Sequence, residues 1–349
     1  MKKLFVLLLA LAMIFALNAC ADKGETPAAE PSPDASVENN ENAEPAVDPS
    51  SLTIGTYLGA TDQFFIMQEA GVKAACDEYG VNFVSAVTTG DAAYEQNTVN
   101  TYLTQGVDGM VLQVMESNAE VYRTANQEGM KIGTLTAFPD NDFTAAGYGY
   151  SQYALGEATA DYAIEYVREK LDGKAKIHLE RVWEGGSTDD RGNAFTDALI
   201  AEFGEENIEI VSTGNAIEVQ VAMQQVRDAL TANPEIDIVF CESEVDLDGA
   251  ISAIEQLGMQ DSVVCFAVDV SEPMCVRLLD EDDNLLQGCG GQDIYVNAYN
   301  TTVDLIKVLL GEKEYVPGTY EEVPALDLNK GNLEAVQDYL DRLREVTGS

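Results

Sequence analysis

From Leu52 onward, the hydrophobic positions of this chain switch between short continuous runs and helical spacing. Leu52–Tyr57 is an apolar run that ends near Gly59, which predicts a buried strand. Helical spacing begins at Phe64 and stops at Gly80, a residue typical of helix ends. Two adjacent rows define the predicted inner face of this helix: Ile66, Ala70 and Ala74, and Met67, Gly71 and Ala75. Because these side chains are mostly small, we expect the helix to lie close to a sheet.

The same alternation continues along the chain. Further strand-like runs are Val81–Val87, Gly109–Val114, Met130–Leu135, Ala175–Val182, Ile208–Ser212, Ile236–Cys241, Val263–Val268 and Leu285–Cys289. Helical stretches lie between them, at Ala93–Gln105, Ala119–Glu128, Tyr153–Leu171, Asp189–Phe203, Glu218–Ala232, Leu247–Leu257 and Asp293–Leu310. This order is typical of β-α-β units with right-handed crossovers, and it predicts an α/β fold with parallel sheets covered on both faces.

We expect two sheets in two lobes, because one core seldom holds about 300 residues. Phe138–Tyr150, with its proline and glycine residues, is typical of a crossing between lobes. The predicted N-terminal lobe comprises residues 51–150 and 293–320, and the predicted C-terminal lobe comprises residues 151–292 and 321–349. A last helix at Asn332–Val346, apolar on one face, is expected to pack on a lobe.

The first 20 residues have the pattern of an export signal. Lys2 and Lys3 precede the apolar run Leu4–Leu17, which is too short for a permanent membrane span. Cys20 follows Ala19 at the predicted cleavage site and resembles the lipidated cysteine of a bacterial lipobox. We expect lipid at Cys20, which would anchor the protein to the outer side of the cell membrane. The alternative is ordinary secretion with loss of Cys20.

Composition and charge narrow the classes of partner. Residues 21–50 consist largely of Ala, Pro, Glu, Asn and Ser, which predicts a disordered acidic tether. The whole chain has 61 acidic and 19 basic residues and a formal net charge of −42. Such a surface repels phosphate backbones, so nucleic-acid binding is excluded.

The cysteine pattern predicts neither a disulfide framework nor a metal site. The five cysteines after Cys20 are an odd number and lack metal-ligand spacing. They are Cys76, Cys241, Cys265, Cys275 and Cys289. Three of them fall in or at the end of strand-like runs, which indicates buried free thiols. We therefore expect no metal and no cofactor.

The loop after the first strand is a candidate ligand site. Ligands of doubly wound sheets bind outside the carboxyl ends of the strands, and Phe64 and Phe65 follow such an end. The rings could bind a ligand or could enter the core instead.

Motifs along the chain resemble those of the type I periplasmic-binding-protein family, above all the ribose-binding branch of sugar ABC-transporter substrate-binding proteins. The motifs are Asp62-Gln63-Phe64-Phe65, Arg191-Gly192 at a helix start, Ile238–Glu244 leading to Gly249-Ala250, Val264–Asp269 ending in aspartate, and Gln292. The resemblance spans Leu52 to Leu328. It implies two Rossmann-like lobes joined by three crossings, which close on a ligand.

The resemblance also implies site residues, and their chemistry suits a sugar. Aromatic rings stack on the C–H faces of a sugar, while carboxylates, arginine and amides bond its hydroxyls. The predicted ligand-binding residues are Asp62, Phe64, Phe65, Glu116, Thr136, Trp183, Arg191, Ser243, Asp269 and Gln292. Arg191 could instead form a surface ion pair with its neighbours, and Asp269 could cap the next helix.

Because the sequence departs from the ribose-binding pattern at three places, it does not determine which sugar is bound. Thr136-Ala137 replaces an Asp-Arg pair, Ile217 replaces a stacking aromatic, and Ser243 replaces an asparagine. Trp183 could supply the missing ring, or could be a core or surface residue. The expected acidic residues of the cleft are Asp62, Glu116, Glu242, Glu244 and Asp269, against Arg191 alone. This balance predicts a neutral ligand, with a cationic one second.

Enzymatic function finds little support in the sequence. The only histidine, His178, alternates with apolar neighbours in a strand, which favours a sheet position over a general base. Gly288–Gly291 mimics a dinucleotide fingerprint, but Asp293 stands where the third glycine is needed. We expect a monomeric, lipid-anchored binding protein that delivers a neutral sugar to an ABC permease. The alternatives are a sensory protein that presents its ligand to a membrane receptor or kinase, and an exported enzyme.

Overall fold

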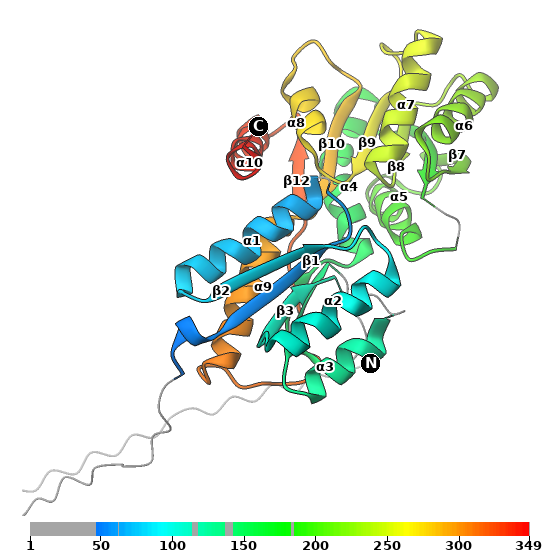
Figure 1. The fold of residues 1–349 in the computed structure, drawn as a ribbon. Helices are drawn as coiled ribbons and strands as arrows, with labels where there is room; N and C mark the ends of the chain where they lie inside the picture. The colour runs from blue at the N-terminus through cyan, green and yellow to red at the C-terminus, as the bar shows by residue number, and fades with distance from the viewer. Residues whose placement is uncertain (1–46, 62, 114–117, 137–141, 183–184, 349) are drawn as a thin grey trace, which may run out of the picture. The chain divides into compact units, whose positions relative to one another are not determined.

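The computed structural model describes residues 47–61, 63–113, 118–136, 142–182 and 185–348, with residue 136 described by its backbone alone. These residues form two six-stranded sheets, each with helices on both faces (Figure 1). This arrangement confirms the predicted α/β fold with two lobes. None of the described helices is both long and apolar enough to span a bilayer.

The N-terminal sheet has the order β11-β5-β4-β3-β1-β2, and all of its strands are parallel. Its strands are β1 (Thr53–Leu58), β2 (Asn82–Val87), β3 (Gly109–Leu112), β4 (Lys131–Thr136), β5 (Thr144–Gly149) and β11 (Glu321–Glu322). The central strands β1 and β3 are almost wholly buried, because helices cover both of their faces.

Helices α1 (Gln63–Tyr79) and α9 (Ile294–Leu309) cover one face of this sheet, and α2 (Ala92–Gln105) and α3 (Ala119–Gln127) cover the other. The inner face of α1 is the row that contains Met67 and Gly71, whereas Ile66 is 37% exposed. The predicted Ile66 row therefore lies at the edge of the buried face. A Cβ at position 71 would collide with the backbone of Tyr295, so the glycine lets α1 lie close to α9.

The C-terminal sheet has the order β12-β10-β9-β8-β6-β7, parallel except for the antiparallel strand β12. Its strands are β6 (Ala175–Arg181), β7 (Ile208–Asn215), β8 (Ile238–Cys241), β9 (Val264–Val268), β10 (Leu286–Gly291) and β12 (Leu326–Asn329). Helices α4 (Gln152–Lys170) and α5 (Asp189–Phe203) cover one face. The other face carries α6 (Val219–Ala232), α7 (Glu244–Leu257), α8 (Glu272–Leu279) and α10 (Leu333–Thr347).

The predicted crossing at Phe138–Tyr150 contains a strand that the prediction did not include. Thr144–Gly149 forms β5, which pairs with β4 inside the N-terminal sheet. The strand was missed because its residues are mostly alanine, glycine and threonine, which give no apolar run. The crossing itself follows at Tyr150, whose hydroxyl accepts a hydrogen bond from the Asp293 backbone N–H at 2.8 Å.

Other polar contacts tie the chain crossings together. The hydroxyl of Tyr150 donates to Asn297 Oδ1 at 3.2 Å, and the backbone N–H of Ser151 donates to Glu322 Oε1 at 3.2 Å. Glu322 belongs to β11, which follows the lobe boundary predicted at residue 320 but pairs with β5 of the N-terminal sheet. The segments near residues 150, 293 and 322 thus contact one another.

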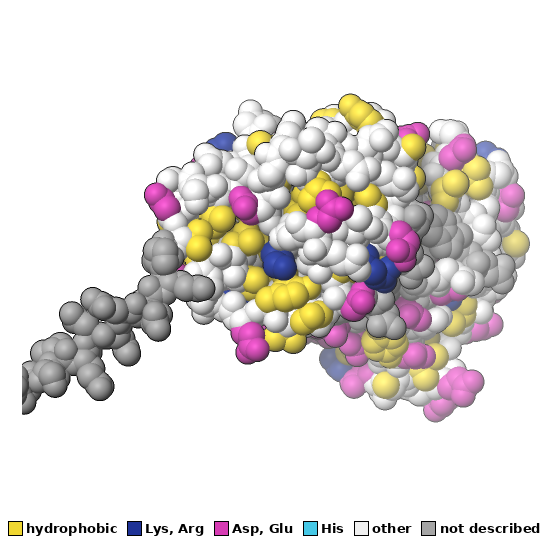
Figure 2. Space-filling view, turned by 60° about the horizontal axis from the view of Figure 1, so that its bottom comes forward, with side chains coloured by type: hydrophobic (Ala, Val, Ile, Leu, Met, Phe, Trp, Pro, Cys, Tyr) yellow, Lys and Arg dark blue, Asp and Glu magenta, His cyan; other side chains and the backbone are white. Residues whose placement is uncertain are grey.

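The described surface is strongly acidic, as the sequence requires. On the face drawn in Figure 2, acidic side chains are scattered among neutral ones and few basic side chains appear. All five described cysteines are buried and free, which confirms the prediction made for Cys241, Cys265 and Cys289 and extends it to Cys76 and Cys275.

Candidate functional site

A cleft of about 520 Å³ lies where strand ends and helix starts of both sheets meet. It is lined by Gln63, Phe64, Glu244, Val245, Asp269, Val270, Ser271, Pro273 and Gln292. Gln63 and Phe64 open α1, which follows β1 of the N-terminal sheet. The other residues come from the carboxyl ends of β8, β9 and β10 and the starts of α7 and α8. This is the edge at which α/β sheets bind ligands.

Three of the predicted ligand-binding residues line this cleft: Phe64, Asp269 and Gln292. Phe65 does not line it. A Cβ on Gly59 would lie 3.0 Å from Cζ of Phe65, so that ring packs against the loop after β1. The two rings meet edge to face with their centroids 5.4 Å apart, so Phe65 packs against Phe64.

Several predicted residues lie outside the part of the chain that the structure describes. They are Cys20, Asp62, Glu116 and Trp183, together with the side chain of Thr136.

Asp269 lies at the end of β9 in an unusual backbone conformation. Its φ is +87°, in a region that residues other than glycine seldom occupy. Its backbone N–H donates to the carbonyl of Gly290 at 3.0 Å, and its carboxylate accepts the N–H of Glu244 at 3.2 Å. The side chain is still 38% exposed. The predicted alternative, that Asp269 caps the next helix, is wrong, because Ser271 is the N-cap of α8 and Asp269 instead binds the first N–H of α7. Asp269 also lines the cleft.

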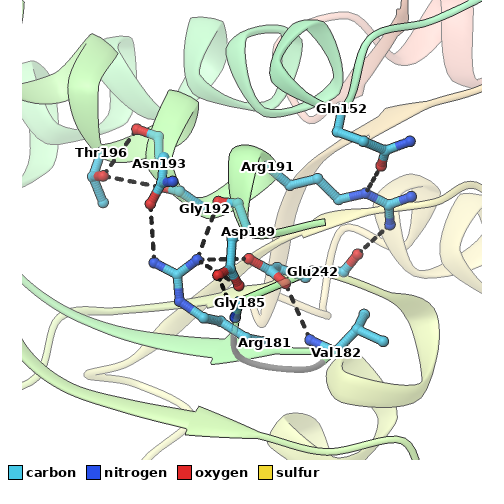
Figure 3. Close-up of polar contacts among 10 residues, drawn as sticks. All are labelled: Gln152, Arg181, Val182, Gly185, Asp189, Arg191, Gly192, Asn193, Thr196 and Glu242. Carbon is cyan, nitrogen blue, oxygen red and sulfur yellow. Dashed lines mark hydrogen bonds and ion pairs between the residues drawn. The ribbon is translucent and has the colours of Figure 1, made fainter. Parts of the chain in front are cut away.

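Arg191 is a buried link between Asp269 and the interior of the C-terminal lobe. Its Nε donates to Gln152 Oε1 at 2.7 Å, and its Nη1 donates to the carbonyl of Glu242 at 2.5 Å (Figure 3). Nη1 also lies 3.7 Å from Asp269 Oδ1. The alternative of a surface ion pair with neighbouring aspartates does not describe this residue, because it is only 8% exposed and pairs with other elements.

The close packing of α4 and α5 fixes where Arg191 starts. A Cβ at Gly156 of α4 would collide with the Arg191 carbonyl, so only glycine allows this approach. Arg191 lies in the first turn of α5, near the carboxyl end of the sheet. Helix packing therefore directs its side chain across the ends of β8 and β9.

Glu242 was expected to be one of the acidic residues of the cleft. This prediction is wrong, because Glu242 does not line the cleft. It is fully buried, and its Oε1 accepts from Arg181 Nη1 at 3.1 Å while its Oε2 accepts from the Val182 backbone N–H at 3.1 Å (Figure 3). Burial raises the pKa of this carboxyl to about 7, despite the opposing effects of the Val182 hydrogen bond and Arg181. Glu242 thus supports the ends of β6 and β8 from inside.

Ser243 is the N-cap of α7. Its hydroxyl donates to Asp246 Oδ2 at 2.8 Å and accepts from the Asp246 N–H at 3.3 Å, which is the hydrogen bond expected of an N-cap serine. Asp246 is fully buried, and burial raises its pKa to about 7. Ser243 does not line the cleft, so its predicted contact with a ligand stays a prediction.

His178 occupies a satisfied position in β6, as expected. Its Nδ1 lies 2.8 Å from Ser212 Oγ, its Nε2 lies 2.9 Å from Glu180 Oε2, and the residue is 1% exposed. Among the described residues, no group of three or more His, Cys, Asp and Glu side chains could hold a metal ion.

The raised pKa values predict that stability falls as pH rises. In the unfolded chain the Glu242 and Asp246 carboxyls lose their protons near pH 4, whereas the folded chain retains them to about pH 7. The folded state therefore binds more protons between these limits, and the free energy of unfolding decreases across that window. At pH 4, the free energy of unfolding of Asp246→Asn should equal that of the wild type. At pH 7.5, it should be higher than that of the wild type by about 2–4 kcal/mol.

Urea unfolding at several pH values measures this effect. Asp248→Asn, an exposed change on the same helix, is the matched control for the loss of one carboxylate and should not reproduce the gain in stability at pH 7.5. Parallel curves for Asp246→Asn and the wild type would show that Asp246 does not titrate as described.

Three backbone N–H groups at the starts of α7 and α8 are hydrogen-bonded within the chain. Glu244 N–H donates to Asp269, and Met274 N–H donates to Ser271 Oγ at 3.5 Å. Glu272 N–H donates to Gln63 Oε1 at 3.1 Å. Free helix N-termini would favour anions, but these donors are already engaged.

Sequence reasoning missed several residues that line the cleft. Gln63 was named only as part of the motif before Phe64 and was not predicted to bind a ligand. The other residues that were not predicted are Val245, Val270, Ser271 and Pro273. The available signal was position: Val270 and Ser271 lie in the loop after β9, and Val245 and Pro273 lie in the first turns of the helices that follow β8 and β9, at the edge where a parallel sheet exposes its loops.

Two parallel α/β sheets, with a cleft lined from both, define a two-lobed binding fold. A sequence model described as the periplasmic binding protein domain matches residues 56–313. The ribose import binding protein RbsB of Bacillus subtilis is 22% identical over 220 residues, covering 62% of this chain and 69% of that protein.

Solved structures share the fold. A sugar ABC transporter sugar-binding protein from Bacillus halodurans has a TM-score of 0.69 at 14% identity, covering 81% of this chain and 98% of its own. The 5-methylthioribose transporter solute binding protein of Thermotoga lettingae has a TM-score of 0.66 at 19% identity, covering 85% and 92%. The family match spans most of the folded chain, so this protein belongs to the periplasmic binding protein family, and the resemblance found in the sequence is confirmed.

Proposed function

We propose that this protein is a lipid-anchored extracytoplasmic solute-binding protein that captures a neutral sugar between its lobes and delivers it to an ABC permease. The supporting observation is the cleft in which Phe64, Asp269 and Gln292 come together from distant parts of the chain. An aromatic face, a carboxylate and an amide are the groups that hold a polyol with an apolar face. The Bacillus subtilis relative, named as a ribose import binding protein, supports the same class of ligand.

The charges at the cleft support a neutral ligand. Glu244 and Asp269 are carboxylates in its lining, whereas its lining includes no lysine or arginine among the described residues. Arg191, which lies 3.7 Å from Asp269, also contacts Gln152 and the Glu242 carbonyl. A sugar acid or sugar phosphate would therefore meet repulsion without a free cation, while hydroxyl groups can donate to the carboxylates.

A thermal-shift panel tests the proposal. Because a ligand that binds only the native state raises the unfolding temperature, neutral sugars should raise it in proportion to their affinity. Matched pairs such as glucose with glucuronic acid and galactose with galacturonic acid separate charge from shape. A larger shift with the acidic member of each pair would contradict the neutral-ligand proposal. Shifts with amino acids alone would contradict sugar binding.

The proposed anchor predicts a change in location. Cys20→Ala should release the protein from the membrane fraction, because the proposed lipid is attached at Cys20 and the described helices include none able to span a bilayer. Cell fractionation with immunoblotting measures this. Cys76→Ala, a change at a buried thiol of the folded domain, is the control and should remain with the membrane. Equal fractionation of Cys20→Ala and wild type would contradict lipidation.

A further inference from the structure

One wall of the cleft is apolar although it is built from helix starts. Val245 in the first turn of α7 is 36% exposed, and Pro273 in the first turn of α8 is exposed. Val270 lies between them after β9, and all three line the cleft. A Cβ on Gly291 would collide with Val270, so close contact with β10 holds this valine in place.

The polar groups around these residues are directed to one another. The Ser271 hydroxyl donates to the Glu244 carboxylate and also accepts the Met274 N–H. Gln63 Oε1 accepts the Glu272 N–H, and Asp269 accepts the Glu244 N–H. Because the Glu244, Glu272 and Met274 N–H groups are engaged in this way, the side chains of Val245, Val270 and Pro273 make up an apolar part of the surface that the wall offers to a ligand.

Such a wall discriminates between parts of a ligand. A sugar hydroxyl placed against it would lose its water without gaining a hydrogen bond, which is unfavourable. An apolar group in the same place would be removed from water favourably in proportion to its area. Hydroxyl groups have partners elsewhere in the cleft, at Asp269 and Gln292.

We infer that the preferred ligand is a neutral sugar derivative with an apolar substituent, and that the substituent lies against Val245, Val270 and Pro273. This inference rests on the proposed sugar-binding function and narrows its substrate class. The sugar ring occupies the side of the cleft formed by Asp269 and Gln292.

Calorimetry with free ribose, glucose and galactose, and with their methyl and phenyl β-glycosides, tests the inference. The phenyl glycoside of the accepted sugar should bind about tenfold more tightly than its methyl glycoside, from the additional apolar area buried. Val245→Thr should reduce phenyl-glycoside affinity about threefold and leave free-sugar affinity unchanged. Val221→Thr, an equally exposed change on α6 that does not line the cleft, is the matched control and should change neither.

The outcomes separate the inference from the proposed function. If free sugars bind as tightly as the phenyl glycosides, or Val245→Thr weakens all compounds equally, the apolar-substituent inference is overturned and sugar binding stands. If none of the compounds binds, both the inference and the proposed sugar-binding function are overturned.

Discussion

Asp269→Asn is expected to weaken ligand binding by about 10- to 100-fold while the protein remains folded. The carboxylate is exposed to the cleft, and hydrogen bonds to charged groups contribute about 1.5–3 kcal/mol each. Asparagine tolerates the positive φ of +87° at this position and keeps an oxygen for the Glu244 N–H. The effect should therefore appear in affinity far more than in stability.

Isothermal calorimetry and urea unfolding measure the two quantities for Asp269→Asn. Asp248→Asn removes the same charge from an exposed site on α7 and controls for the change in overall charge. Unchanged affinity in Asp269→Asn would remove Asp269 from the ligand site and leave it only the role of capping α7.

Arg191→Met should lower the free energy of unfolding by about 2–4 kcal/mol and should also strongly reduce ligand affinity. The methionine preserves volume but leaves the Gln152 side chain and the Glu242 carbonyl without their donor inside the lobe. The substitution also removes the guanidinium that lies 3.7 Å from the Asp269 carboxylate. The carboxylate then loses the positive charge that helps to hold it in position for the ligand.

Arg181→Met is the matched control for this variant. Arg181 contacts Glu242 and Asp189 but has no contact with Asp269, so its loss should destabilise the lobe with a much smaller effect on affinity (Figure 3). Urea unfolding and calorimetry on both variants separate the two effects. If the two substitutions lower affinity equally, Arg191 acts only through the stability of the lobe.

The repeating order of strand and helix could be predicted because buried parallel strands have continuous apolar sequences. Val263–Val268 and Ile236–Cys241 differ from the observed β9 and β8 only at their ends. Strand β5 could not be found in this way, because Thr144–Gly149 relies on small residues that fit against neighbouring side chains. Strand β12 was missed because Leu326–Asn329 is short and antiparallel at an edge.

The site was predictable where a residue type has a strong preference. A phenylalanine at a helix start and an aspartate at a strand end are conspicuous, and Phe64 and Asp269 do line the cleft. Glu242 was misplaced because its sequence position gives no direction for the side chain, and the carboxylate turns inward to Arg181. The direction of a side chain after a strand depends on packing partners that lie far away in sequence.

Small-angle X-ray scattering with and without saturating ligand tests the central claim, that a ligand binds between the lobes and draws them together. The account predicts a smaller radius of gyration for the wild type when the sugar identified by the thermal-shift panel is added, and a smaller decrease for Asp269→Asn at the same concentration, because this variant binds the sugar more weakly. A radius of gyration that stays the same in the wild type at full saturation would contradict it.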